Sequence, residues 1–221
     1  MKIAGLQKTT LIDYPGEVAC TIFLFGCNFR CGFCHNPELV IQKFEEDFSE
    51  KKILDFLNRR KGKLDAVCIS GGEPLMSLDL DFVRKIKNLG YKVKVDTNGS
   101  FPEKLKQLIE EDLIDAVAMD VKASRENYSK VAGVKVDIEK IEESIGLISN
   151  LGNYEFRTTV VRRFHDVSEM KAIGRWLNEV CRKKPRKFFL QGFKSKSDLI
   201  DKSFSKEKDV SEDYLDGLKK G

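Results

Sequence analysis

The sequence has no long hydrophobic run: none approaches the roughly 18 residues that a helix needs to cross a bilayer. Its N-terminus also lacks the apolar core of a signal peptide, so we expect a cytoplasmic protein with no membrane partner. The charge is nearly balanced, with 39 basic and 35 acidic residues and a net charge of +4. That excess is too small and too dispersed to indicate a nucleic-acid-binding surface. Solenoid repeats and low-complexity tracts are missing too, which excludes repeat proteins and disordered chains.

Cysteine occurs six times, and in a reducing compartment these residues do not predict a disulfide framework. Three of them lie in apolar contexts that resemble strands or helices and are expected to be small core residues: Cys20, Cys68 and Cys181. The other three, Cys27, Cys31 and Cys34, have the spacing C-x₃-C-x₂-C. Thiolates are soft ligands that select iron–sulfur clusters, zinc or copper(I). The spacing therefore predicts a metal or cluster site.

The number of ligands decides what kind of site this is. A structural zinc or iron–sulfur site is closed by four protein ligands, whereas three thiolates leave one position open. His35 directly follows Cys34, so a closed zinc site with His35 as its fourth ligand is an alternative. Adjacent ligands rarely reach one tetrahedral ion without strain, which favours an open-sited cluster. Gly26 and Gly32 would allow the positive φ angles that a tight cage requires.

Hydrophobic patterns predict strands alternating with helices. An N-terminal strand and a turn at Tyr14-Pro15-Gly16 come first. Further strands are expected over residues 18–25, 64–70, 91–95, 115–121, 154–161 and 186–191. Helices are expected over residues 49–60, 78–89, 102–111, 137–150 and 168–181. Residues 123–136 read as a loop or partial helix, and the weakly patterned tail has a short helix from about Ser211.

This alternation predicts a parallel sheet with right-handed crossovers. A closed barrel of eight units typically needs about 250 residues, whereas this chain offers six β/α units in 221 residues. We therefore predict an α/β fold, a partial (β/α)6 barrel with an N-terminal strand or hairpin extension. A flat doubly wound sheet is the competing architecture. Residues 1–193 would form the core, and residues 194–221 a tail that packs on it or extends from it.

Four polar or glycine-rich groups follow successive predicted strands. The cysteine loop, residues 27–34, follows the first strand, and residues 71–74 follow the second. Residues 96–98 follow the third strand, and residues 120–122 end the fourth. Parallel α/β folds bind ligands at the carboxyl ends of their strands. We therefore expect these four groups to converge on one rim.

Gly71 and Gly72 would expose backbone that can approach an amino-acid-like ligand, with Glu73 available to an ammonium group. A simple strand-to-helix turn is the structural alternative for the glycine pair. The pair does not form a phosphate-binding fingerprint, because neither G-x-G-x-x-G nor a Walker pattern surrounds it.

Charged residues supply the rest of the predicted rim. Asp96 and Asp120, with Lys122 nearby, could bind hydroxyls, a carboxylate or a cation. Arg157 lies inside an apolar strand and needs an anionic partner; a ligand carboxylate and a structural aspartate are equal alternatives. His165 stands in a polar loop, where a solvated loop or a helix cap is expected, and we assign it no role.

Together, these motifs resemble a known family. The cysteine spacing with Phe33 before the last cysteine, followed by G-G-E-P at residues 71–74, resembles the radical S-adenosylmethionine superfamily. Longer matches make the chain similar to glycyl-radical-enzyme activases, most closely the anaerobic ribonucleoside-triphosphate reductase activating proteins. The likeness runs from about residue 3 to about residue 193. The longer matches are L-I-D-Y-P-G (11–16), C-H-N-P (34–37), D-T-N-G (96–99), M-D-V-K (119–122) and F-R-T-T-V-V (156–161).

The resemblance implies a [4Fe-4S] cluster held by Cys27, Cys31 and Cys34, whose remaining iron chelates the amino and carboxylate groups of S-adenosylmethionine. One electron from a reduced flavodoxin or ferredoxin would cleave the sulfonium. The resulting 5′-deoxyadenosyl radical would remove a hydrogen from a backbone glycine of a glycyl radical enzyme. The protein's own task would be to orient the cofactor and exclude water.

The same resemblance implies roles near the two ends of the cofactor. Phe33 and His35 would lie near the adenine. Gly72, in the pair with Gly71, would meet the methionine amine together with Glu73.

It also implies roles for the charged residues. Asp120 and Lys122 would contact the ribose or the carboxylate, and Arg157 would meet the carboxylate. Asp96 and Asp120 would hold a monovalent cation.

Two departures limit the resemblance. Some activases carry a ferredoxin-like insert with further cysteines, whereas residues 37–70 contain only Cys68, so we expect a single cluster. Pyruvate formate-lyase activases have a histidine at the end of the last strand, where this chain has Gln191-Gly192-Phe193. That difference argues against pyruvate formate-lyase as the target.

Two rival functions remain. One is a radical enzyme that acts on a small molecule, like 7-carboxy-7-deazaguanine synthase; the sequence shows no obvious insert that would cap the rim, which favours the activase. The other is a non-catalytic zinc-binding interaction module, which would not explain why the glycine and carboxylate motifs follow successive strands.

Overall fold

The computed structural model describes residues 1–41, 48–182, 184–185, 187–196 and 198–220. The linking segment expected after Pro37 falls partly on residues 42–47, outside the described residues. Arg186, the first residue of the last expected strand, also lies outside them. None of the helices in the described part combines the length and the hydrophobicity that crossing a membrane requires.

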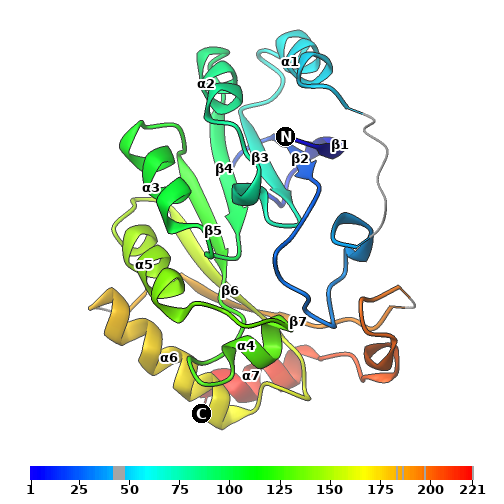
Figure 1. The fold of residues 1–221 in the computed structure, drawn as a ribbon, viewed down its shortest axis with the longest axis vertical. Coiled ribbons are helices and arrows are strands. Elements are labelled where there is room, and N and C mark those ends of the chain that lie inside the picture. The colour runs from blue at the N-terminus through cyan, green and yellow to red at the C-terminus, as the bar shows by residue number, and fades with distance from the viewer. Residues whose placement is uncertain (42–47, 183, 186, 197, 221) are drawn as a thin grey trace. The chain divides into compact units, whose positions relative to one another are not determined.

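Strands and helices alternate along the chain as the hydrophobic patterns predict (Figure 1). The strands are β1 (Ile3–Thr10), β2 (Ala19–Leu24), β3 (Ala66–Gly71), β4 (Lys92–Thr97), β5 (Ala116–Asp120), β6 (Tyr154–Val160) and β7 (Phe188–Gly192). The α-helices are α1 (Glu50–Arg59), α2 (Leu80–Asn88), α3 (Pro102–Glu110), α4 (Tyr128–Ala132), α5 (Ile138–Ser149), α6 (Val167–Cys181) and α7 (Glu212–Lys220). Short 3₁₀ helices are η1 (Pro37–Leu39), η2 (Pro74–Met76) and η3 (Lys202–Lys206).

The strands form one seven-stranded sheet in chain order, from β1 to β7. The first strand is antiparallel to β2, whereas β2–β3, β3–β4 and β6–β7 are parallel pairs, as β/α units predict. This confirms the predicted class, an α/β fold with an N-terminal strand ahead of the β/α units.

The chain divides into two compact units. The first comprises Met1–Asn28, Glu38–Thr97 and Glu103–Ala118, and the second comprises Phe29–Pro37, Asn98–Pro102 and Met119–Gly221. The tail from residue 194 lies in the second unit together with residues of the predicted core. The predicted division of the chain at residue 193 stays a prediction.

The core of the first unit lies between its strands and the helices that follow them. Both α1 and α2 begin at a side-chain cap, Ser49 and Asp79. The two helices contact each other, and α2 packs on β4. The fully buried side chains include Ile53, Leu57, Phe82, Val83, Ile86, Ile22, Leu24, Val67, Ile69, Val93 and Val95. Each such side chain stabilises the fold by about 1.5–3 kcal/mol.

The predicted turn at Tyr14-Pro15-Gly16 is confirmed: the Glu17 N–H donates to the Tyr14 carbonyl at 3.1 Å. The turn folds back onto the sheet, because buried Tyr14 packs with Ala19 and other small residues of the strands. Its neighbour Asp13 accepts a hydrogen bond from Thr21 on β2 at 2.5 Å. The hairpin extension is thereby fixed to the first parallel strands.

On β2, β3 and β4, the residues Thr21, Cys68 and Lys94 lie side by side in register. Side chains alternate between the two faces of a strand, so these three share one face of the sheet. That face therefore carries a polar row, whereas the adjacent row on the opposite face, Ile22, Ile69 and Val95, is apolar and fully buried.

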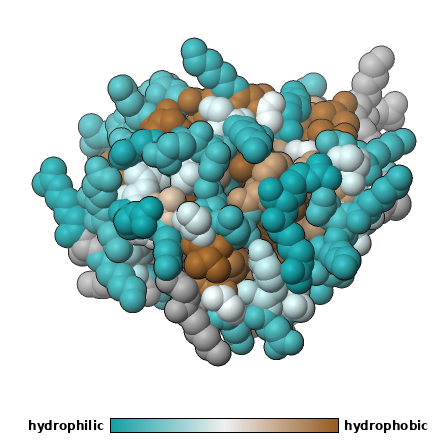
Figure 2. Space-filling view, turned by 90° about the horizontal axis from the view of Figure 1, so that it is seen from below, coloured by the Kyte–Doolittle hydropathy of each residue, from teal (hydrophilic) through white to brown (hydrophobic). Residues whose placement is uncertain are grey.

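In the second unit, β6 and β7 form a parallel pair, α5 packs on α6, and α7 packs on β7 and α6 (Figure 1). The short helix expected from about Ser211 is confirmed as α7, and the partial helix expected within residues 123–136 is α4. Figure 2 shows one face of the molecule, where hydrophilic side chains dominate and hydrophobic ones form small separate patches.

Candidate active site

Two glycines at the end of β3 bring its backbone against the strand that leads into the cysteine loop. The Gly72 N–H donates to the Leu24 carbonyl at 3.0 Å, and the Glu73 N–H donates to the Gly26 carbonyl at 2.7 Å. A Cβ at position 72 would lie 2.1 Å from the Gly26 oxygen, and one at position 71 would lie 2.2 Å from the Leu24 oxygen. Both positions therefore require glycine.

Cys27 follows directly on this backbone contact. A Cβ added at Gly72 would lie 3.1 Å from the Cys27 Cβ. Gly26, just before the cysteine, has φ +100°, a conformation that favours glycine. Its N–H donates to the Leu39 carbonyl at 2.8 Å. The main chain on both sides thus fixes the place of the first thiol.

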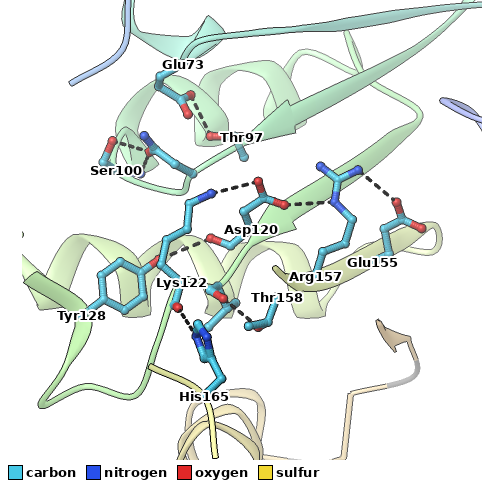
Figure 3. A network of polar contacts seen from close by, with 12 residues as sticks. Glu73, Thr97, Ser100, Asp120, Lys122, Tyr128, Glu155, Arg157, Thr158 and His165 are labelled. Atoms are coloured by element: carbon cyan, nitrogen blue, oxygen red, sulfur yellow. Dashed lines mark hydrogen bonds and ion pairs between the residues drawn. The ribbon is translucent and has the colours of Figure 1, made fainter. Parts of the chain in front are cut away.

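Glu73 is fully buried, and one of its oxygens has two donors. The Leu75 N–H donates to Oε1 at 3.1 Å, which caps η2, and the Thr97 hydroxyl donates to Oε1 at 2.8 Å (Figure 3). The carboxylate therefore ties the carboxyl end of β3 to that of β4. Its predicted contact with an ammonium group stays a prediction.

The second half of the cysteine loop belongs to the second unit, where buried Cys31 and half-buried Cys34 lie. The Arg30 N–H donates to the Ala132 carbonyl at 2.8 Å, and a Cβ at Gly133 would lie 2.2 Å from the Arg30 oxygen. Within the loop, the Cys34 N–H donates to the Cys31 carbonyl at 3.0 Å. This half of the loop is a tight turn anchored on the end of α4.

The aromatic residue before the last cysteine is part of a buried cluster. The Phe33 ring centroid lies 6.1 Å from Phe204, 6.3 Å from Phe164 and 6.5 Å from Phe193. His35 stacks on Phe193 with centroids 5.3 Å apart, and its Nε2 lies 2.7 Å from the Lys194 carbonyl. Both predicted adenine neighbours are thus held by residues near the start of the tail.

Asp120, at the end of β5, is held by two cations of its own unit (Figure 3). Its Oδ2 lies 3.0 Å from Lys122 Nζ, and its Oδ1 accepts from Arg157 Nε at 3.0 Å. Burial alone would raise the pKa of this carboxyl, but the two adjacent positive charges outweigh it and hold the pKa well below its usual range. Arg157 also lies 3.6 Å from Glu155. The sequence left two alternatives for the anionic partner of Arg157, a ligand carboxylate or a structural aspartate. The structure shows a structural aspartate beside it, Asp120.

Asp96 has a protein cation beside it as well. The Lys94 ammonium donates to Asp96 Oδ1, and the Cys68 thiol lies 3.8 Å from the same oxygen. Lys94 is only 2% exposed, so this is a largely desolvated ion pair. Each of the two carboxylates predicted to share a monovalent cation is thus already paired with a positive side chain within its own unit.

His165 corrects the expectation of a solvated loop, because its side chain is fully buried. Its Nδ1 accepts from the Val161 N–H at 3.0 Å, and its Nε2 lies 2.9 Å from the Lys122 carbonyl (Figure 3). These partners fit one neutral tautomer, in which Nε2–H donates to Lys122. Burial lowers the pKa of His165 and keeps the ring neutral. The histidine thus joins the turn after β6 to the segment after β5.

A buried glutamate that the sequence reasoning missed supports the same segment. Glu169, in the first turn of α6, accepts from the Ser124 N–H at 2.6 Å, the Ser124 hydroxyl at 3.1 Å and the Asn127 amide at 2.7 Å. The sequence indicates only that Glu169 lies in the first turn of a helix, because Asp166 caps α6 three residues earlier and accepts from the Glu169 N–H. Nothing in the pattern indicates that the carboxylate reaches residues 124–127.

The donors of the cysteine loop bear on the choice between a cluster and a closed zinc site. The six cysteines form no disulfide, and burial raises the pKa of the core residue Cys20 to about 12. In the described ranges, no three His, Cys, Asp or Glu side chains are grouped around a single ion position. His35, the fourth ligand in the zinc alternative, is stacked and bonded through Nε2. Thiolates are soft ligands that suit an iron–sulfur cluster, and the assignment of Cys27, Cys31 and Cys34 to one cluster stays a prediction.

Comparison with known proteins agrees with this donor set. The family model described as the Radical SAM superfamily matches residues 21–177. A protein of Methanocaldococcus jannaschii that is assigned as a glycyl-radical enzyme activating enzyme is 33% identical over 216 residues, covering 92% of this chain and 84% of that protein.

Two further likenesses cover less of the matched proteins. The pyruvate formate-lyase-activating enzyme of Listeria monocytogenes is 30% identical over 134 residues, which is 55% of this chain and 53% of the enzyme. The crystal structure of Streptococcus suis SuiB bound to S-adenosylmethionine has a TM-score of 0.66 at 16% identity, covering 89% of this chain and 44% of SuiB. At that identity, the second likeness shows the fold alone.

We predict that the variant His165→Gln unfolds more easily at pH 7, by about 1–3 kcal/mol, because the buried Val161 N–H loses its acceptor. It should also respond less to acid. The native ring takes up its proton below the ordinary value of 6.5, so the unfolded state binds more protons in that interval and wild-type stability falls as the pH falls. Urea unfolding between about pH 7 and pH 5 measures both effects. An NMR titration in which His165 takes its proton at or above pH 6.5 would contradict this account.

We also predict that the thermal midpoint does not depend on Na⁺ or K⁺, because Lys94 already neutralises Asp96. Replacing either salt with choline chloride at equal ionic strength should leave the wild-type midpoint unchanged. Lys94→Met removes the cation beside the partly buried Asp96 carboxylate, which costs about 3–5 kcal/mol, and Na⁺ or K⁺ should restore part of the loss where choline does not. Lys92→Met, which removes an exposed lysine of the same strand, is the matched control. A wild-type midpoint that rises with Na⁺ or K⁺ but not with choline would refute the prediction.

Proposed function

This chain belongs to the radical SAM superfamily and to its glycyl-radical enzyme activase family, and from that premise we propose that it activates an anaerobic ribonucleoside-triphosphate reductase. The cofactors of this superfamily are a [4Fe-4S] cluster and S-adenosylmethionine. When bound, they supply the 5′-deoxyadenosyl radical that removes a hydrogen atom from a backbone glycine of the partner. The side chains and backbone of this protein bind and orient those cofactors.

We assign the cluster to Cys27, Cys31 and Cys34. The observation that carries this assignment is the backbone contact between Gly72 and the residues before Cys27. It fixes the first thiol before any metal arrives and presents the end of β3 beside it. A preorganised set of thiolates loses little conformational freedom when it takes up a cluster.

The methionine end of the cofactor is assigned to the residues at the end of β3. We propose that Gly71 and Gly72 present backbone to the amino group, and that Glu73 provides the negative charge that an ammonium requires. The Glu73 side chain is held by Leu75 and Thr97 through Oε1, so its carboxylate has a fixed orientation. Fixed charges stabilise a bound ion without a reorganisation cost.

The charged residues of the second unit are assigned to the ribose and the carboxylate. Asp120 remains ionised, so it can accept hydrogen bonds from ribose hydroxyls. Lys122 and Arg157 are already oriented by Asp120, and their positive charges can attract a carboxylate. Phe33 and His35 are assigned to the adenine end, where His35 is held in place by Phe193 and Lys194.

The partner and the electron donor are the finer parts of the proposal. The choice of an anaerobic ribonucleoside-triphosphate reductase is supported by the longer motifs, such as M-D-V-K at residues 119–122 and F-R-T-T-V-V at residues 156–161. The end of β7 reads Gln191-Gly192, without the histidine of pyruvate formate-lyase activases. We further propose a reduced flavodoxin or ferredoxin as the electron source and the cytoplasm as the compartment.

Anaerobic activation assays test the proposal. The reconstituted protein is incubated with S-adenosylmethionine, reductant and one candidate enzyme at a time, and the glycyl doublet is recorded by electron paramagnetic resonance. We expect the doublet on anaerobic ribonucleoside-triphosphate reductase, no doublet on its glycine-to-alanine variant, and none when Cys31→Ala replaces the wild-type activase. Pyruvate formate-lyase serves as the comparison partner and should give at most a weak signal.

Two outcomes would overturn the proposal. A doublet on pyruvate formate-lyase alone would reject the assigned partner. Cleavage of S-adenosylmethionine that depends on a small molecule such as a pterin, without a doublet on any protein, would instead support the rival that acts on a small molecule.

A further inference from the structure

The segment from Asp201 to Glu207, which contains η3, lies against the cysteine loop of its own unit. We propose that this segment is a clamp that positions the Cys31 and Cys34 thiols. This proposal depends on the proposed function in one respect: it takes Cys31 and Cys34 as ligands of the cluster. Nothing in the pattern of this charge-balanced stretch predicts such a role.

A main-chain hydrogen bond makes the first connection. The Asp201 N–H donates to the Gly32 carbonyl at 2.9 Å, between the two cysteines. The Asp201 carboxylate in turn accepts from the Ser203 N–H at 2.8 Å and caps η3. The loop and the short helix therefore share one residue as their junction.

Close packing makes the second connection. A Cβ added at Gly32 would lie 2.7 Å from Phe204 Cε2 and 3.0 Å from the Asp201 Cβ. Phe204 is 4% exposed, and its ring lies 6.1 Å from that of Phe33 and 5.8 Å from that of Phe164. The absence of a side chain at position 32 is what allows the Phe204 ring to reach the loop.

The far side of the clamp is fixed to the turn after β6. The Arg163 guanidinium lies over the Phe204 ring, 4.3 Å from its centroid. It also contacts the Glu207 carboxylate at 2.6 Å and donates to the Ser203 hydroxyl at 3.2 Å. Phe204 is therefore held between the cysteine loop and an arginine that is itself bound to Ser203 and Glu207.

Cys31 consequently lies between two anchored neighbours. On one side, Arg30 bonds to the Ala132 carbonyl and packs against Gly133. On the other side, Gly32 bonds to Asp201 of the clamp. Loss of the clamp removes the anchor on the Gly32 side, so the turn that carries both thiols gains freedom to open locally.

Thiol accessibility in the apoprotein tests the clamp without relying on catalysis. We would measure the rates at which iodoacetamide alkylates Cys31 and Cys34, resolved by peptide mass spectrometry. Phe204→Ala should raise both rates by about tenfold or more through local opening. The matched control is Leu218→Ala, which removes a buried apolar side chain from α7 of the same tail. It should leave both rates near wild type, with both variants measured well below their melting temperatures.

A double-mutant cycle separates a specific contact from general loosening. Gly32→Ala places a methyl group against the Phe204 ring, so it should also raise the alkylation rates. In Gly32→Ala/Phe204→Ala the methyl group occupies space that the ring has left, so the double variant should react no faster than Phe204→Ala alone. Additive effects of the two substitutions would contradict the packing argument.

A readout on the loaded protein completes the test. We expect the reduced cluster of Phe204→Ala to give an altered electron paramagnetic resonance signal and to be lost to a chelator several-fold faster than that of Leu218→Ala. If Phe204→Ala matches Leu218→Ala in alkylation, signal and chelation, the clamp is rejected. If the wild type binds no cluster but the alkylation result holds, the proposed function fails while the clamp stands.

Discussion

The contact on which this structure depends is between two stretches of backbone. The end of β3 lies so close to the residues leading into the cysteine loop that no side chain fits at Gly71 or Gly72. Two hydrogen bonds fix the register of this approach. The first thiol and the glycine-rich turn are therefore positioned by main-chain geometry, which varies less than side-chain rotamers do. A site that must hold a reactive cofactor in one orientation gains from this rigidity.

The charged side chains at the strand ends form small neutral groups within each unit. Lys94 neutralises Asp96 in the first unit, and Lys122 and Arg157 balance Asp120 and Glu155 in the second. The two adjacent positive charges hold the pKa of Asp120 well below its usual range. The ion pairs also hold these carboxylates in fixed orientations. Neutral His165 and buried Glu169 then hold the backbone that carries Asp120 and Lys122. The network therefore presents oriented donors and acceptors before any ligand binds.

Local patterns in the sequence were enough to predict the regular elements. Alternating apolar runs located the strands and helices. That the polar residues at successive strand ends form one site stays a prediction, which rests on the rule that parallel strands place their carboxyl ends at one edge. The burial of the His165 side chain could not be predicted, because it depends on a contact with Lys122, forty-three positions away in the chain. Phe204 was missed for a similar reason: a single aromatic residue in a charged tail has no periodicity. The partner of Arg157 stayed open because any acidic group would have satisfied the same argument.

The central claim is that three thiolates hold a cluster with one iron left for S-adenosylmethionine. Mössbauer spectroscopy of protein reconstituted with isotopically enriched iron tests it most directly, because the spectrum distinguishes iron sites by their ligands. The account predicts a [4Fe-4S] cluster in which one of the four iron sites, and no other, changes its parameters when S-adenosylmethionine is added. A spectrum that does not change on addition, or purified protein that holds zinc with a fourth side chain as ligand, would contradict it.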